Sequence, residues 1–272
     1  MKWPKYSTRG PLRGPCNICG VVDLLTDDHV PPKGCPRVST MRMHQLIRVL
    51  GDGQVLPTGR QAQSGVKYRT LCKRCNSQRL GIECDPALIS LAQNVDRFLS
   101  AISAGIVVPS HTLVRTRPQR VLRAVVGHSL AAAVERPADG DWDRDLVAYS
   151  MDSSCSFPTS ARVHYWIYPF QQQVAIRDAG YLSLLKADRD KNPTIFMCLK
   201  FYPLAFMIVD CRDRNYTFDL PCLSDYGALP LDNEIEVPIY LKNLPGELWP
   251  EAPSTNHVVI YGGDPLFARS AR

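Results

Sequence analysis

The chain has 272 residues, enough for one large domain or two ordinary ones. Hydrophobic residues make up 45% of it and charged residues 21%, which is the composition of a soluble globular protein. No apolar run is long enough to cross a bilayer, and no apolar segment follows the basic N-terminus. We therefore expect no membrane span and no signal peptide, and the expected compartment is the cytoplasm.

The net charge of +6 is unevenly distributed along the chain. Residues 1–133 contain 19 Lys and Arg against 7 Asp and Glu, whereas residues 134–272 contain 13 against 19. Because phosphate contacts supply most non-specific affinity for nucleic acid, the basic half is predicted to face a polyanion. Ordinary scatter of surface charge is the alternative interpretation.

The chain opens with a basic segment, residues 1–15, that is rich in Pro and Gly and is predicted to be an extended arm. Such an arm either contacts DNA or is a disordered leader. Cys16-Asn-Ile-Cys19 then predicts a tight turn whose two thiolates converge on one ion. The apolar residues that follow predict a strand leading to Asp28-His29. Pro31-Pro32 ends this strand, because proline has no amide hydrogen for a ladder.

The next stretch predicts a helix, a loop and a return strand. Residues 41–50 have apolar positions at helical spacing, and residues 66–71 are partly β-branched or aromatic. A helix over residues 72–80 is predicted to end at Gly81. A second helix, over residues 85–103, is expected to begin with Asp85 as its N-cap and Pro86 at its first position.

A third helix is predicted over residues 119–135, with an arginine cluster at its start. Four arginines stand there, and they form either a phosphate-contacting face or ordinary solvated surface: Arg115, Arg117, Arg120 and Arg123. Residues 137–144 are polar and contain Pro and Gly, so the expected domain boundary lies there.

Beyond the boundary the pattern favours strands. The predicted strands cover residues 146–151, 162–168, 173–176, 195–199, 205–210, 236–241 and 257–261. Four apolar residues are expected in the core, namely Trp166, Phe196, Phe206 and Ile208. We find no internal repeat and no catalytic constellation in this half. The predicted fold class is α+β, with a C-terminal domain over residues 137–272 that is mixed α/β or mostly β.

Four of the ten cysteines form two C-x-x-C pairs, Cys16 with Cys19 and Cys72 with Cys75. In a reducing compartment such pairs are better interpreted as metal ligands than as disulfides. Four thiolates close a tetrahedral zinc site and leave no position for substrate, which makes the predicted zinc structural. Unmetallated core thiols are the alternative.

Between the two cysteine pairs lies Asp28-His29, and Asn76 directly follows the last cysteine. Phosphodiester hydrolysis needs a base that activates water and a cation that stabilises the leaving oxygen. Imidazole titrates near neutral pH and suits the base, whereas carboxylate and amide oxygens suit Mg²⁺. Taken singly, a surface Asp-His pair and an Asn at a helix start are the ordinary interpretations.

Together these motifs resemble the HNH endonuclease family and its ββα-metal fold, closest to the group with two zinc knuckles. The resemblance covers about a quarter of the chain and implies a nuclease domain over residues 16–84, followed by a helical extension over residues 85–136. It implies that His29 is the general base, that Asp28 and Asn76 ligate a catalytic Mg²⁺ or Mn²⁺, and that the four cysteines hold structural zinc. Family members commonly carry an Asn on the second strand that orients the histidine. Here that strand offers Lys67, Tyr68 and Arg69, so the orienting role is unassigned.

The sequence therefore predicts a metal-dependent endonuclease that cleaves double-stranded DNA to a 3′-hydroxyl and a 5′-phosphate, although RNA would serve the same chemistry. By analogy the protein belongs to a restriction or phage-defence system, and its C-terminal half sets specificity, binds a partner or mediates self-association. The residues expected to bind nucleic acid are all basic: Lys33, Lys67, Arg69, Lys73, Arg74 and Arg79. The alternatives are a non-catalytic zinc-containing nucleic-acid-binding protein and a scaffold protein.

Overall fold

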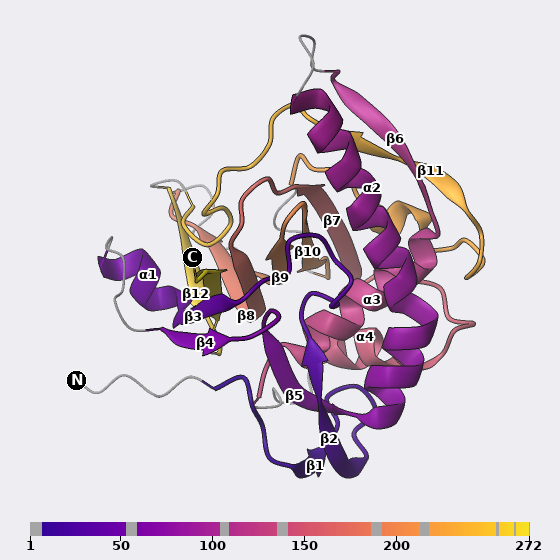
Figure 1. Cartoon of the computed structure of the whole chain (residues 1–272), viewed down its shortest axis with the longest axis vertical. Helices are drawn as coiled ribbons and strands as arrows, with labels where there is room; N and C mark the ends of the chain where they lie inside the picture. The colour runs from indigo at the N-terminus through magenta and orange to yellow at the C-terminus, as the bar shows by residue number, and fades with distance from the viewer. Residues whose placement is uncertain are drawn as a thin grey trace.

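The computed structural model describes residues 7–52, 59–103, 109–134, 141–185, 192–212, 218–253, 256–263 and 265–271. It confirms the α+β class, because helices pack against antiparallel sheets throughout the described chain (Figure 1). Residues 1–6 of the predicted arm and residues 135–140 at the predicted boundary lie outside the described ranges.

The N-terminal part is a small antiparallel sheet that leads directly into a long helix. Its strands are β1 (Arg13–Pro15), β2 (Val22–His29) and β5 (Lys67–Cys72), in the order β1-β2-β5. The chain then forms a wide π-helical segment, η1 (Arg74–Cys84), which continues as α2 (Asp85–Ser103). Both strands predicted around the Asp28-His29 motif are thus confirmed.

The predicted helix over residues 85–103 is confirmed as α2, but the predicted helix end at Gly81 and the N-cap role of Asp85 are wrong, because η1 runs on to Cys84 and continues into α2 without a break. At their junction the Asp85 amide donates five residues back, to the Leu80 carbonyl. Pro86 has no backbone N–H to donate within the helix, and the wide π-helical turn before it leaves room for the proline ring. Asp85 consequently does not act as an N-cap, and its carboxylate is available for another partner.

The largest sheet has eight antiparallel strands and draws on both halves of the sequence. Its order is β4 (Arg60–Ala62), β3 (Met41–Gln45), β13 (Leu266–Ser270), β8 (Gln173–Ser183), β9 (Thr194–Phe201), β10 (Leu204–Asp210) and β7 (Ala161–Ile167), and β12 (His257–Tyr261) also pairs with β8. A separate pair joins β6 (His111–Thr116) to β11 (Ile235–Tyr240), and a short 3-10 helix, η3 (Leu223–Tyr226), lies between β10 and β11.

The predicted helix over residues 41–50 is half wrong, because β3 precedes a short helix, α1 (Leu46–Asp52). Met41 and Met43 are buried and Arg42 between them is not, which is the two-residue period of a strand. Since β3 pairs with β13, the first and last parts of the chain share one sheet. The division into domains stays a prediction, and any boundary must take into account that β3 and β13 pair in one sheet.

The strand predicted at residues 146–151 is also wrong, because this segment belongs to helix α4 (Asp141–Met151). Trp142, Leu146 and Tyr149 are buried at helical spacing on its inner face. The other six predicted strands are confirmed in place. The four predicted core residues of this half are buried, although Trp166 and Phe196 lie in a different cluster from Phe206 and Ile208.

Helix α3 (Pro118–Ala131) lies at the centre of the protein, between the N-terminal sheet, α2, α4 and the large sheet (Figure 1). Thirteen of its fourteen residues are buried, so it is covered on every side. A Cβ on Gly127 would collide with a methyl group of Leu80, so only glycine lets η1 approach this closely. The predicted third helix is therefore confirmed, with an earlier end.

The four arginines at the start of α3 differ in their surroundings: Arg123 is buried, Arg120 is partly buried, and Arg115 and Arg117 are exposed. Arg123 is buried, and its guanidinium donates to the carbonyls of Tyr149, Asp152, Ser153 and Cys155 at the C-terminal end of α4. Arg120 pairs with Asp232, and Arg115 pairs with Glu234. For Arg123 both predicted roles, phosphate contact and solvated surface, are therefore wrong.

Replacing Arg123 with Ala should lower the free energy of unfolding by about 3 kcal/mol or more, because the substitution leaves several buried carbonyls without a donor. Urea unfolding followed by circular dichroism measures the change. The matched control is Arg117→Ala at the exposed N-cap of the same helix, for which we expect a change within about 0.5 kcal/mol. Equal effects of the two substitutions would contradict a structural role for Arg123.

Candidate metal centre and active site

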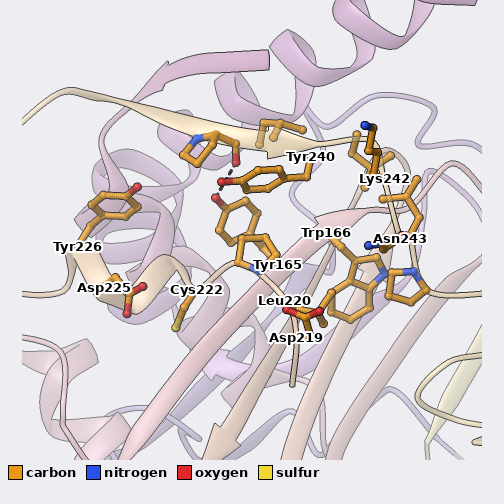
Figure 2. A pocket seen from close by; sticks show the side chains of 16 residues that line it. Tyr165, Trp166, Asp219, Leu220, Cys222, Asp225, Tyr226, Tyr240, Lys242 and Asn243 are labelled. Atoms are coloured by element: carbon orange, nitrogen blue, oxygen red, sulfur yellow. Dashed lines mark hydrogen bonds between the residues drawn. The ribbon is translucent and has the colours of Figure 1, made fainter. Parts of the chain in front are cut away.

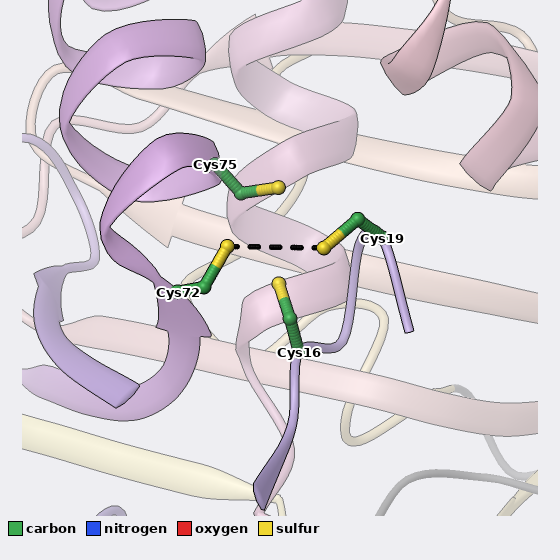
Figure 3. Close-up of side chains that lie close together, drawn as sticks. All are labelled: Cys16, Cys19, Cys72 and Cys75. Atoms are coloured by element: carbon green, nitrogen blue, oxygen red, sulfur yellow. Dashed lines mark hydrogen bonds between the residues drawn. The ribbon is translucent and has the colours of Figure 1, made fainter. Parts of the chain in front are cut away.

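The four paired cysteines converge on one point (Figure 3). Cys16 and Cys19 come from the turn after β1, Cys72 ends β5, and Cys75 lies in the first turn of η1. All four Sγ atoms lie within 4.8 Å of one another, and the Sγ atoms of Cys19 and Cys72 are 3.7 Å apart. Zinc–sulfur bonds of about 2.3 Å in a tetrahedron place the sulfurs roughly 3.8 Å apart. The cluster could therefore hold a metal ion such as zinc.

Local backbone geometry explains how the first pair forms a knuckle. Gly20 has φ +72°, a conformation that favours glycine, and its amide donates to the Cys16 carbonyl at 2.8 Å. Within the turn, the Asn17 carboxamide donates to the carbonyls of Leu130 and Ala133, at the C-terminal end of α3. The knuckle is thus tied to the central helix as well as to the second cysteine pair.

The thiols of the cluster differ in their acidity. A hydrogen bond from the Cys75 thiol and several backbone amides lower the pKa of Cys16 to about 4, although burial opposes this. The same hydrogen bond raises the pKa of Cys75. Metal ligation requires deprotonated thiols, and in the metal-free cluster the shared hydrogen bond favours the thiolate of Cys16 over that of Cys75.

Asn76 is held against strand β2 next to the Asp28-His29 pair. Its Nδ2 donates to Thr26 Oγ1 at 2.9 Å and to the Asp27 carbonyl at 3.2 Å. The structure therefore places the Asn76 carboxamide on β2 directly before Asp28, where the pairing with β5 shifts register between Thr26 and Asp27.

Asp28 is buried and belongs to a chain of three charged side chains. Its Oδ2 lies 2.9 Å from His128 Nδ1 on α3, and His128 Nε2 lies 2.9 Å from Asp85 Oδ1 at the start of α2. Side-chain exposures are 3% for Asp28, 1% for His128 and 13% for Asp85, so this chain is almost entirely shielded from water. These three side chains join β2, α2 and α3.

Burial and charge pairing have opposite effects on the pKa values of Asp28 and His128. Burial raises the pKa of Asp28, and the positive charge of His128 reduces that rise. Burial alone would lower the pKa of His128, but the charges and hydrogen bonds of Asp28 and Asp85 together raise it well above its ordinary value. His128 therefore lies between two carboxylates that favour its charged form.

His29 is half-buried at the end of β2, directly opposite Lys67 in the strand register. Burial lowers the pKa of His29, and the neighbouring charge of Lys67 lowers it further, while Asp28 opposes both. An imidazole with a lowered pKa is neutral at pH 7 and can accept a proton. His29 ends β2 directly after Asp28, and the charges of these two side chains act on each other.

The predicted nucleic-acid-binding residues fall into two groups. Lys33, Lys73 and Arg74 are exposed, and Lys67 is half-buried beside His29. Arg69 instead pairs with Asp27 at 3.2 Å, and Arg79 donates to the carbonyls of Ser150 and Met151 at the end of α4. The guanidinium of Arg79 is thus engaged inside the protein.

Sequence reasoning missed His128 and Asp85. His128 lies among apolar residues of a helix that is buried all round, and a polar residue in such a place needs a partner. That signal was present in the sequence. The partner was not identifiable, because Asp28 is 100 residues away and Asp85 is 43 residues away.

A second concave site lies apart from these residues, beside the edge strand β7 (Figure 2). Its volume is about 470 Å³, and its walls include Tyr165, Trp166, Tyr226, Tyr240 and Lys242. The Tyr165 hydroxyl donates to the Pro238 carbonyl across it at 2.7 Å. None of the predicted site residues lines this cavity.

Neither a protein-family model, a curated protein nor a solved structure matches the chain. The resemblance to HNH nucleases therefore rests on the motif residues themselves. Among the described helices, none has the length and apolar character that a membrane crossing requires.

Replacing Cys72 with Ala should reduce bound zinc from about one ion per chain to a small fraction of that. It should also lower the unfolding temperature, because binding to a structural zinc site contributes directly to folding. Elemental analysis and calorimetry on the same samples measure both quantities. Cys155→Ala, at an exposed cysteine outside the cluster, should leave both unchanged. Full zinc content in Cys72→Ala would contradict the four-thiolate site.

Replacing His128 with Leu should destabilise the protein by about 3–5 kcal/mol, because Asp28 then remains buried without a counter-charge. Adding Asp28→Asn to this variant removes the unpaired charge. The double variant should therefore be more stable than His128→Leu alone, as a urea-unfolding cycle will show. Strict additivity of the two changes would disprove the coupling.

Proposed function

We propose that this chain is a metal-dependent endonuclease of the HNH type that hydrolyses phosphodiester bonds in double-stranded DNA. The observation that carries the proposal is the position of Asn76. A helix fixed by the cysteine cluster holds its carboxamide on the strand that bears Asp28 and His29. The order of knuckle, strand, strand, knuckle and helix supports the same assignment.

The donor atoms present fit a hard divalent cation. Asn76 uses its Nδ2 for both hydrogen bonds to β2, and no described residue donates to its Oδ1. Asp28 commits Oδ2 to His128, and within the described chain its Oδ1 has no hydrogen-bond partner. Each side chain thus keeps one oxygen for Mg²⁺ or Mn²⁺. When bound there, such an ion would stabilise negative charge on the leaving oxygen.

His29 would take a proton from the attacking water at its imidazole nitrogen, because its lowered pKa keeps the ring neutral at pH 7. For this step the phosphate must lie at the end of β2, next to Lys67 and within reach of the exposed Lys33. Both ammonium groups attract a phosphodiester to that end of the strand.

One observation favours the alternative of a non-catalytic zinc protein that binds nucleic acid. Asp28 is only 3% exposed and is paired with His128, as a purely structural carboxylate would be. In that case the contacts among Asp28, His128 and Asp85 serve only to join β2, α2 and α3. The same basic surface would then bind DNA without cleaving it.

The wider biological role rests on analogy. Nucleases with this plan suit restriction or phage defence, and the acidic C-terminal half would set specificity, bind a partner or mediate self-association. The aromatic cavity beside β7 lies in that half and is separate from the proposed active site.

A plasmid-nicking assay with Mg²⁺ or Mn²⁺ tests the proposal. Substituting His29→Ala should lower the nicking rate about 100-fold or more, because general-base catalysis typically contributes 10²–10⁴-fold. His111→Ala, at an exposed histidine on β6, should cleave at the wild-type rate.

Binding measured by fluorescence anisotropy without added Mg²⁺ separates the alternatives. Under the nuclease proposal, the His29→Ala variant binds DNA as tightly as the wild-type protein but no longer cleaves it. DNA binding with no cleavage by either protein, across several divalent metals, would establish the non-catalytic alternative. Absence of both binding and cleavage would favour a scaffold protein.

A further inference from the structure

A small basic pocket lies where the N-terminal segment, β4 and the start of β5 meet. Its volume is about 260 Å³. Three cationic side chains line it, Arg9, Arg60 and Lys67, and the remaining walls come from Thr8, Met43, Gln61, Ala62, Gln63 and Gly65. No carboxylate is among these lining residues.

Backbone contacts place Arg9 at this pocket. The Arg69 amide donates to the Thr8 carbonyl at 2.9 Å, and residues 9 and 69 form a parallel bridge, so the middle of the predicted arm lies against β5. A Cβ on Gly10 would come 2.5 Å from the Arg69 carbonyl oxygen, so glycine permits this approach. Figure 1 shows this segment, next to the N-terminal trace, running alongside β5.

The pocket carries more positive charge than the surrounding residues neutralise. Arg9 has one acidic neighbour, Asp27 at 3.7 Å, and Asp27 is shared with Arg69. In the part of the chain that the structure describes, neither Arg60 nor Lys67 forms an ion pair. Cations held close together repel one another, and an anion bound between them relieves that repulsion.

The lining also indicates which anion fits. A water molecule occupies about 30 Å³ of liquid, so the pocket has room for a tetrahedral oxyanion with several waters. None of its walls is an aromatic ring on which a base could stack. Guanidinium groups bind phosphate oxygens in pairs, and Gln61 and Gln63 add amide donors. The site therefore suits a phosphate group rather than a nucleobase.

We propose that Arg9, Arg60 and Lys67 form a phosphate-binding site. Lys67 lines the pocket and is also the cross-strand partner of His29, so a phosphate held here lies beside the proposed general base. This assignment of the ligand rests on the proposed nuclease function: the ligand is a DNA backbone phosphate next to the phosphate at which the strand is cleaved. Free inorganic phosphate has the same chemistry and is the other source.

The test compares full-length wild-type protein with the variant Arg60→Gln, Lys67→Gln. A fluorescein-labelled DNA duplex is titrated without added divalent metal, at several NaCl concentrations. We expect about tenfold weaker binding, since a hydrogen bond to a charged group contributes a factor of this order. The slope of log K against log salt should become shallower by about 1 for each phosphate-binding cation that the substitutions remove.

A charge-matched control removes the effect of net charge. Arg115→Gln, Arg162→Gln changes two exposed arginines on β6 and β7, away from the pocket, and should bind like the wild type. Zinc content and the unfolding midpoint verify that each protein is folded. If the first variant fails to fold, Arg60→Gln alone, at an exposed position, should give about half the change in slope.

A second arm follows the unfolding temperature with added inorganic phosphate at constant ionic strength. Stabilisation of wild type but not of the pocket variant, with unchanged duplex binding, assigns the site to free phosphate. Weaker duplex binding by the pocket variant assigns it to the nucleic-acid backbone. The proposal is overturned if the pocket and control variants agree in both arms. Both arms measure binding or stability and not cleavage. Failure of the phosphate site therefore appears in these arms, whereas failure of the nuclease proposal appears in the plasmid-nicking assay.

Discussion

Hydrogen bonds tie the buried C-terminal end of helix α3 to the cysteine knuckle and to strand β5 of the N-terminal sheet. The last carbonyls of a helix have no partner within the helix, and burying them unpaired is costly. Here Asn17 donates to Leu130 and Ala133, and the Thr70 hydroxyl donates to Ala131 at 2.7 Å. Because Asn17 lies between two cysteines of the cluster, the metal centre and the central helix fix one another.

The buried contacts of His128 with Asp28 and Asp85 add charged side chains to the same contact between α3 and the N-terminal sheet. A buried carboxylate is tolerated when a cation and hydrogen bonds accompany it, and removing one member leaves the others with the full desolvation penalty. Asp28 is thereby fixed in orientation, which serves a metal ligand and a structural residue equally well. Whether Asp28 is a metal ligand depends on its Oδ1 atom, because His128 contacts only Oδ2.

The cations of the basic half divide into two populations that composition does not distinguish. Arg79 and Arg123 donate to backbone carbonyls at the end of α4 and stabilise the fold. Arg60 and Lys67 open onto a pocket without acidic walls. The residue count therefore overstates how many cations are free to bind a polyanion, and one of those lining the pocket, Lys67, lies opposite His29.

The sequence by itself determined the order of knuckle, strand, strand, knuckle and helix, because turn residues, prolines and alternating apolar residues act over a few neighbouring positions. It also located most strands of the second half. Only the tertiary structure decided that residues 146–151 are helical and that β3 joins β13 at the far end of the chain. Only the fold revealed that Asp28 meets His128 and Asp85. A local pattern reports which face of a segment is buried, but the partner that covers it comes from a distant part of the chain.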